Sequence, residues 1–222
     1  MPPAAVERKK KVFVVDDHPL VRESLANLIN QQPDLVMCGE AGNSREALAG
    51  IDASSPDVAI VDISLKDSFG IELIKKLRAS HPKVILLVLS MHDESLYAER
   101  VLRSGAMGYI MKQEATKKVI EGIRQVLEGK IYVSENFAQA MATQFVEGKL
   151  PGKGSPVQQF TDRELEIFEL LGQGCRTTQI AKLLRVSTKT VHAYCARMRE
   201  KMSLGSSREL LREAFRWNES NR

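Results

Sequence analysis

Near the start of the chain stands Val12-Phe13-Val14-Val15-Asp16-Asp17, a short β-branched and aromatic run that ends in two carboxylates. Other apolar runs also end in one polar residue: Asp62 after 58–61, Ser90 after 84–89, and Lys112 after 109–111. Short apolar runs separated by helical patterns are typical of a parallel sheet covered on both faces. Because ligands of such sheets bind at the carboxyl ends of the strands, we predict that these polar side chains share one pocket.

The spacing of the apolar positions predicts an α/β fold over residues 10–130. Strands are expected at 11–15, 35–41, 57–62, 84–89 and 107–111, and helices at 19–31, 44–51, 69–80, 94–104 and 116–128. Repeated strand–helix units form a doubly wound parallel sheet. Asp16 and Asp62 end the first and third strands, which are neighbours where the strand order switches. We therefore predict a flavodoxin-like, five-stranded sheet of order 2-1-3-4-5.

Residues 157–217 predict a second, all-α domain of four helices. The first helix begins with the capping box Thr161-Asp162-Arg163-Glu164 and ends near 171. Further helices are expected at about 178–184, 188–202 and 207–217. The tight connection at 184–187 predicts a helix-turn-helix. Residues 131–156 are predicted to be a linker, with a helix at 135–146 and a flexible part rich in Gly, Pro and Lys at 147–156.

The composition of the 222 residues, 43% hydrophobic and 27% charged, is typical of a globular protein. Cys38, Cys175 and Cys195 lack the paired spacing of disulfides or zinc sites. No run approaches the roughly 18 apolar residues that a membrane span needs. The sequence therefore predicts a cytoplasmic protein without a membrane partner.

The net positive charge is concentrated at the C-terminal end of the chain. Residues 1–156 hold 20 Lys and Arg against 20 Asp and Glu, whereas residues 157–222 hold 12 against 8. A local positive excess on a small domain favours a polyanion partner, and double-stranded DNA is the partner we expect. The alternative is a helical interaction domain with a solvated basic face, although charges on such faces more often alternate in sign.

The chemistry of the predicted pocket assigns a role to each member. Carboxylates from Asp16, Asp17 and Asp62 form an oxygen-rich site that suits Mg²⁺. An aspartate oxygen can attack phosphorus and form an acyl phosphate, and Asp62 is the central carboxylate. The Ser90 hydroxyl and the Lys112 ammonium would then hold the phosphoryl oxygens. Other residues near the pocket are predicted to be turn, rim or core residues rather than ligands: His18, His92, Met91 and Met111.

Four segments of residues 10–130 resemble the motifs of a two-component receiver domain: 14–22, 61–64, 88–92 and 105–112. The resemblance implies that Asp62 accepts a phosphoryl group from a sensor histidine kinase. It also implies that Asp17 binds Mg²⁺ directly, Asp16 binds it through water and Ser64 through its carbonyl. Tyr109 would be the switch aromatic coupled to Ser90. The chain departs from the usual motifs at 66–68 and at Gln113, where the geometry of the Lys112–Gln113 peptide is left open.

The third C-terminal helix is predicted to be the recognition helix. Its apolar stripe consists of Val191, Cys195, Met198 and Met202, at the spacing of one helix face. The opposite face mixes small and polar residues, which lets a helix enter the major groove. The predicted DNA contacts on and near this helix, some to phosphates, are Thr178, Lys189, Thr190, His192, Ala193, Arg197 and Lys201.

Residues 160–166 and 186–192 resemble the LuxR-type helix-turn-helix, and this resemblance covers about 157–217. A receiver followed by this module is the arrangement of the NarL/FixJ class of transcription regulators. Tyr194 and His192 depart from the residues most usual at their positions. These two departures bear on the DNA sequence that is recognised, not on the mode of binding.

The patterns together predict a DNA-binding transcription regulator of a two-component phosphorelay, and not an enzyme. Phosphorylation of Asp62 is expected to shift the receiver between conformations. A homodimer would then place two recognition helices on half-sites about one helical turn apart. Release of an interdomain contact and receiver dimerisation are both open as routes of control. Two other functions are the alternatives: a phosphatase with an aspartyl nucleophile, which needs a second acid where this chain has Ser64, and a phosphate-independent scaffold.

Overall fold

The computed structural model describes residues 8–65, 70–147 and 156–220, and the chain divides into two compact units, Met1–Ser134 and Glu135–Arg222. Each unit has its own core and is described separately. Most of the linker part that was predicted to be flexible, 148–155, lies outside the described residues. Residues 66–69, which include the motif departure at 66–68, also lie outside them. None of the helices in the described ranges is long and apolar enough to cross a membrane.

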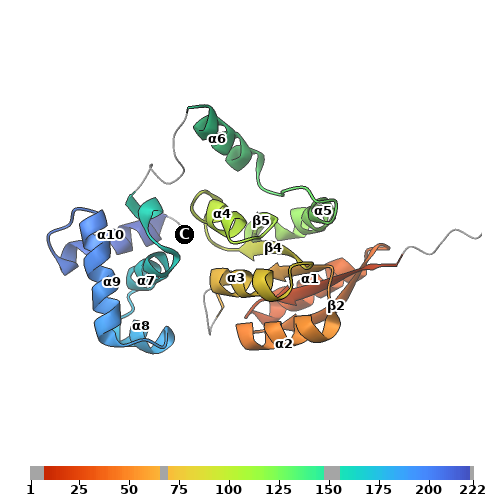
Figure 1. Ribbon diagram of the computed structural model, residues 1–222, viewed down its shortest axis with the longest axis horizontal. Helices are drawn as coiled ribbons and strands as arrows, with labels where there is room; N and C mark the ends of the chain where they lie inside the picture. The colour runs from red at the N-terminus through yellow and green to blue at the C-terminus, as the bar shows by residue number, and fades with distance from the viewer. Residues whose placement is uncertain (1–7, 66–69, 148–155, 221–222) are drawn as a thin grey trace, which may run out of the picture. The chain divides into compact units, whose positions relative to one another are not determined.

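The first unit is a five-stranded parallel sheet with helices on both faces (Figure 1). The strands are β1 Lys10–Val15, β2 Leu35–Ala41, β3 Val58–Val61, β4 Ile85–Ser90 and β5 Gly108–Met111. Their order is β2-β1-β3-β4-β5, so the predicted order is confirmed. The connections reverse direction across the sheet between β1 and β3, and a crevice for ligands forms at such a switch point.

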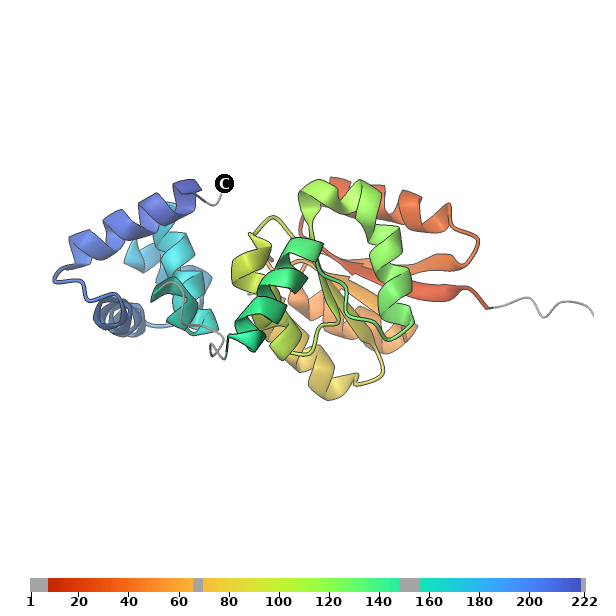
Figure 2. The ribbon, with the colours of Figure 1, turned by 90° about the horizontal axis from the view of Figure 1, so that it is seen from above.

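The helices of this unit lie close to their predicted positions: α1 Pro19–Asn30, α2 Ser44–Ser54, α3 Gly70–Ser80, α4 Glu94–Arg103 and α5 Ala115–Leu127. Figure 2 shows α1 and α5 on one face of the sheet and α2, α3 and α4 on the other. Apolar residues of α1 and α5, such as Ile29 and Ile123, pack with β-branched residues of β1 and β3 in one buried cluster. The helix α2 extends three residues past its predicted end and stops at Ser55, whose φ is 46°.

One residue after β4 is exposed although the sequence predicted it to be buried. Met91 was predicted to fill the core, but it is 56% exposed because it lies beyond Ser90, the last residue of β4. The burial pattern of a strand does not continue into the loop that follows it.

In the second unit, the described helices are α6 Glu135–Val146, α7 Asp162–Gly172, α8 Thr177–Leu183, α9 Thr188–Lys201 and α10 Ser207–Ser220. The predicted capping box begins α7: Thr161 accepts from the Glu164 amide, and Glu164 accepts from the Thr161 amide. The aromatic rings of Phe160, Phe168 and Trp217 pack together and join α7 to α10. The four helices α7–α10 therefore form the predicted all-α domain around one core.

Candidate functional site

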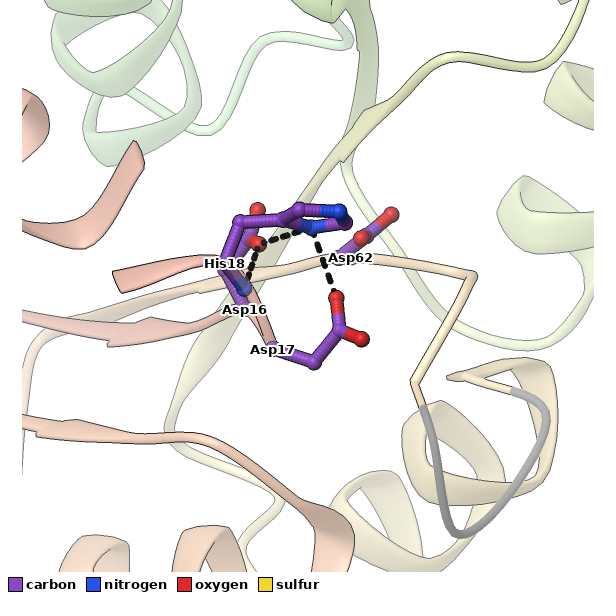
Figure 3. A group of neighbouring side chains, drawn as sticks. All are labelled: Asp16, Asp17, His18 and Asp62. Carbon is purple, nitrogen blue, oxygen red and sulfur yellow. Dashed lines mark hydrogen bonds and ion pairs between the residues drawn. The ribbon is translucent and has the colours of Figure 1, made fainter. Parts of the chain in front are cut away.

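The acidic pocket lies at the carboxyl ends of β1 and β3 (Figure 3). Asp16 and Asp17 follow β1, and Asp62 follows β3, which pairs with β1 in parallel. Ligand atoms of Asp16, Asp17, His18 and Asp62 all lie within 4.8 Å of one another. The structure thus brings the three predicted carboxylates together, because the register of the two strands leaves their ends level.

Lys112 enters the same pocket from the end of β5. Its Nζ lies 2.6 Å from Asp16 Oδ2 and 2.7 Å from Asp62 Oδ2, and its side chain is only 8% exposed. Burial alone would lower the pKa of Lys112, but the neighbouring carboxylates of Asp62 and Asp16 raise it above its ordinary value. The ammonium is therefore held in its charged form between the two carboxylates. The Lys112–Gln113 peptide is trans.

Asp62 is almost completely buried, with 1% of its surface exposed. Burial raises the pKa of its carboxyl above the ordinary value, and the ammonium of Lys112 opposes this shift. The backbone around Asp62 is closely packed, because a Cβ on Gly70 would collide with the Asp62 carbonyl oxygen and lie 2.7 Å from Ile63 Cα. Glycine at the first residue of α3 thus lets this helix approach the loop that positions the central carboxylate.

Ser90 and Tyr109 lie on the neighbouring strands β4 and β5, and both are fully buried. Ser90 pairs with Met111, the residue before Lys112, so the register places Ser90 and Lys112 at the same end of the sheet. The Ser90 hydroxyl accepts from the His92 amide at 3.2 Å, and the Tyr109 hydroxyl donates to the His92 carbonyl at 2.7 Å. Serine and tyrosine therefore hold the same loop, which leads from β4 into α4.

Ser64 lies in the loop after Asp62, and its amide donates to Asp62 Oδ1 at 3.1 Å. Its hydroxyl is 2.7 Å from His92 Nε2, so a side-chain contact joins the loop after β3 to the loop after β4. The His92 ring also packs on Tyr97 of α4, with centroids 4.7 Å apart. His92 is thus a rim residue between two loops, in keeping with its predicted place.

The donor set of the pocket fits Mg²⁺. Its carboxylates are hard oxygen donors, which this ion prefers over nitrogen or sulfur. His18 Nδ1 lies 2.7 Å from Asp17 Oδ1 and 3.2 Å from Asp16 Oδ1, so this ring lies against the acidic cluster. The His18 side chain is 62% exposed, which marks it as a rim residue in the turn before α1.

In the second unit, α8 and α9 are joined by the tight turn 184–187, with Arg185 at a φ of 52°. Ser187 caps α9 by accepting from the Thr190 amide at 3.0 Å. Arg163 of α7 donates to the Leu184 carbonyl at 2.9 Å and pairs with Glu166 at 2.6 Å. The angle between α8 and α9 is therefore stabilised by the turn conformation, by the Ser187 cap and by the hydrogen bond from α7.

The predicted recognition helix, α9, has two distinct faces. Its buried face contains Val191, Cys195 and Met198, as predicted, while Met202 is only half-buried. Four predicted DNA-contact residues of α9 and one of α8 are exposed: Lys189, His192, Ala193, Arg197 and Thr178. Thr190 is half-buried, and its hydroxyl is 2.8 Å from Ser187 Oγ. Arg197 lies over the Tyr194 ring, 5.5 Å from its centroid.

Lys201 differs from this group. Its Nζ lies 2.6 Å from Glu164 Oε2 and 3.0 Å from the Gln159 carbonyl, so it ties the end of α9 to the start of α7. Glu164 is 2% exposed. The pair with a buried carboxylate gives Lys201 a structural role. Its DNA contact stays a prediction.

Comparisons with known proteins agree with both halves of this picture. A family model described as a response regulator receiver domain matches residues 12–124. A model described as bacterial regulatory proteins of the luxR family matches residues 158–214. The chain is a response regulator of the NarL/FixJ class. As in the rest of this class, it is a DNA-binding transcription regulator and not an enzyme.

The response regulator is similar over most of its length to curated relatives. It is 35% identical to the transcriptional regulatory protein UhpA of Escherichia coli K12 over 92% of this chain and 97% of UhpA. It is 32% identical to the oxygen regulatory protein NreC of Staphylococcus carnosus over 93% of this chain and 97% of NreC. The family assignment thus covers both domains and the linker between them.

Solved structures show the same fold. RcsB from Salmonella enterica serovar Typhimurium, bound to the promoter rprA in the presence of BeF3−, is 24% identical over 92% of this chain and 98% of that one, with a TM-score of 0.68. A LuxR-family response regulator from Aurantimonas sp. SI85-9A1 is 29% identical, covers 63% of this chain and 99% of its own, and has a TM-score of 0.58.

Two features of the response regulator could not be found from sequence patterns. The contact between Ser64 and His92 joins residues 28 positions apart and depends on the shapes of two loops. The burial of Glu164, Glu166 and Glu169 is the second feature, because acidic residues in a helix ordinarily indicate a solvent face. The capping box was the one available signal, since it showed that the Glu164 carboxylate turns back toward the backbone.

Proposed function

We propose that transfer of a phosphoryl group to Asp62 controls promoter binding by the C-terminal domain. The observation that carries this proposal is the pocket itself: a buried carboxylate, Asp62, lies 2.7 Å from the ammonium of Lys112 and beside two further carboxylates. Burying several charged groups together costs desolvation free energy, and apolar side chains would stabilise a core at least as well. The group of side chains is suited to a ligand that brings both negative oxygens and a cation.

In the proposed transfer, an oxygen of Asp62 attacks the phosphorus of a phosphohistidine on a sensor histidine kinase. The new bond is a phosphorus–oxygen bond, and the phosphorus–nitrogen bond to the kinase histidine breaks. Asp16, Asp17, Asp62 and the Ser64 carbonyl would hold Mg²⁺, which would neutralise the charge of the phosphoryl oxygens. Lys112 would exchange part of its contact with Asp16 and Asp62 for a phosphoryl oxygen.

The response to phosphorylation would pass through Ser90 and Tyr109. Phosphorylation adds about −1.5 to −2 charge, which draws the Ser90 hydroxyl and the Lys112 ammonium toward the new oxygens. Ser90 and Tyr109 both contact the backbone of His92, so a shift of Ser90 changes the loop that Tyr109 holds. This loop leads directly into α4, where a change in packing can alter the receiver surface.

The output step is proposed to be binding of α9 in the major groove of double-stranded DNA. The exposed face with Lys189, His192 and Arg197 supports this role, because it combines positive charge with hydrogen-bond donors. We propose homodimers as the active form, since two α9 helices could then bind half-sites about one helical turn apart. Response regulators receive signals from kinases inside the cell, and we therefore propose the cytoplasm as its location.

The experiment is phosphoryl labelling of the full chain by radioactive acetyl phosphate with Mg²⁺. Asp62→Ala is expected to abolish labelling, whereas Asp52→Ala is expected to keep it, because Asp52 is an exposed carboxylate on α2. Omission of Mg²⁺ should also reduce labelling of the wild-type chain. Labelling of Asp62→Ala at the wild-type level would contradict the proposed acceptor.

A further inference from the structure

The residues after α5 return to the open edge of the sheet and pair with β5. Gly129, with a φ of 79°, reverses the chain after α5. The Tyr132 amide then donates to the Met107 carbonyl at 2.9 Å, and the Tyr109 amide donates to the Tyr132 carbonyl at 2.8 Å. These bonds form an isolated parallel bridge between Gly108 and Tyr132. We call residues 131–134 the edge segment.

The edge segment is fitted closely to β5 and α5. A Cβ on Gly108 would lie 2.7 Å from the Tyr132 carbonyl oxygen and 3.0 Å from Tyr132 Cβ. A Cβ on Gly122 of α5 would lie 3.1 Å from a carbon of the Tyr132 ring. Tyr132 is 8% exposed, whereas the preceding Ile131 is 61% exposed. The position of the segment is therefore set by one buried ring and two backbone hydrogen bonds.

The same segment is connected to the loop after β4 by two routes. In the first route, Tyr109 bonds to the Tyr132 carbonyl through its amide and to the His92 carbonyl through its hydroxyl. In the second, the Ser134 amide donates to Glu94 Oε1 at 2.8 Å, and Glu94 is the first residue of α4. A movement of the loop between β4 and α4 therefore acts on the edge segment at two residues, Tyr132 and Ser134.

We propose that the edge segment is the output connection of the receiver, with Tyr132 as its positioning residue. Ser134 ends the first compact unit, and Glu135 begins α6, so any shift of the segment is passed along the chain toward the DNA-binding domain. This inference rests on the proposed function, because it names how the phosphorylated state of Asp62 reaches the linker. A segment that only covers an exposed sheet edge would stabilise the fold without this coupling.

The test compares three variants of the full chain: Tyr132→Ala, Tyr132→Phe and Ile131→Ala. DNA affinity is measured by fluorescence anisotropy on a duplex selected from a random-sequence pool, with and without beryllofluoride and Mg²⁺. If the wild-type gain lies in the usual range of allosteric coupling, about 5- to 150-fold, Tyr132→Ala should reduce it to less than about twofold. Tyr132→Phe keeps the ring, and Ile131→Ala changes an exposed side chain, so both should keep the gain.

Two additional readouts separate coupling from folding and from phosphoryl chemistry. Acetyl phosphate should label Asp62 in Tyr132→Ala as in the wild-type chain, because the pocket is unchanged. In wild-type protein, hydrogen exchange of the Tyr109 and Tyr132 amides should change on addition of beryllofluoride.

A Tyr132→Ala chain that is labelled normally and keeps the wild-type gain would overturn the edge-segment proposal alone, as would unchanged exchange at both amides. A wild-type chain without any gain in DNA affinity would overturn the control by Asp62 as well.

Discussion

The acidic pocket and the exposed face of α9 use charge in opposite ways. In the pocket, the side chains of Asp16, Asp62 and Lys112 are almost fully buried, and the ammonium lies at hydrogen-bond distance from both carboxylates. On α9, Lys189 and Arg197 are exposed, and their charges face solvent. Buried charges interact strongly and respond to any new charge placed among them. Exposed charges contribute little to stability, but they are available to a partner of opposite charge.

The difference predicts which activity, phosphoryl labelling or DNA binding, a substitution in each region should change. On the proposed function, a change in the pocket is expected to alter the chemistry at Asp62 and every step that depends on it. A change on the α9 face is expected to alter DNA affinity and to leave phosphoryl labelling intact. A basic residue of α9 is not available to a partner merely because of its position on this helix. Lys201 pairs with Glu164, and this partly buried pair holds α9 against α7.

The largest effect is expected for Lys112→Met, which keeps most of the side-chain volume and removes the charge. Loss of a charge-assisted hydrogen bond of about 1.5–3 kcal/mol should slow phosphoryl labelling of Asp62 by about ten- to hundredfold. The matched control is Lys118→Met, since Lys118 lies on α5 with its side chain 38% exposed and pairs with Glu114. Equal labelling rates for the two variants would contradict the claim that a buried charge matters more than an exposed one for phosphoryl transfer.

The next effect concerns the other region. Arg197→Ala should weaken binding to the selected duplex by about 2 kcal/mol, or roughly thirtyfold, as for an arginine that contacts a base. Arg212→Ala on α10 is the control, because its side chain is 62% exposed but lies on another helix. Phosphoryl labelling should be unchanged in both. An equal loss of affinity in both variants would show that DNA affinity depends on the net positive charge of the domain and not on its position on α9.

A smaller effect is expected for Glu164→Gln, which keeps the capping bonds and removes the charge opposite Lys201. The free energy of unfolding of the C-terminal domain should fall by about 1 kcal/mol. Unfolding in urea can be followed by Trp217, the single tryptophan of the chain, whose ring packs on Phe168. Glu200→Gln, at an exposed position of α9, is the control and should leave the urea midpoint unchanged.

The same pair has a defined pH dependence. Burial would raise the pKa of Glu164, but hydrogen bonds from Lys201 and Thr161 hold it below its ordinary value. A lowered folded-state pKa means that the stabilisation is complete above the unfolded value of about 4.3 and is lost as the pH falls through the folded-state pKa. The stability difference between wild type and Glu164→Gln should therefore shrink below about pH 4.3. A difference that grows in acid would contradict the lowered pKa.

The smallest effect belongs to a surface pair of the receiver. Arg124 of α5 donates two hydrogen bonds to Asp34, both at 2.8 Å, with the two side chains 44% and 46% exposed. A double-mutant cycle with Arg124→Ala and Asp34→Ala should give a coupling energy below about 1 kcal/mol. A coupling of several kcal/mol would show that the exposure of a charged side chain does not predict its contribution to stability in this protein.

The fold and the pocket could be predicted because both depend on local patterns. The strands β1, β3, β4 and β5 are built on apolar runs. Asp16, Asp62, Ser90 and Lys112 follow these runs directly, so parallel topology brings them to one edge. The role of Lys201 could not be predicted, because its partner Glu164 is 37 positions away and its burial depends on how α7 and α9 pack. The edge segment was predicted only as the start of a linker, since a single bridge has no strand-length pattern.

The most direct test of the central claim is the DNA affinity of the full chain with and without beryllofluoride and Mg²⁺, measured for wild type and for Asp62→Ala on the same selected duplex. The account predicts a gain of about fivefold or more for wild type and none for Asp62→Ala. The same affinity for wild type in both conditions, or an equal gain in Asp62→Ala, would contradict control of DNA binding by the acidic pocket.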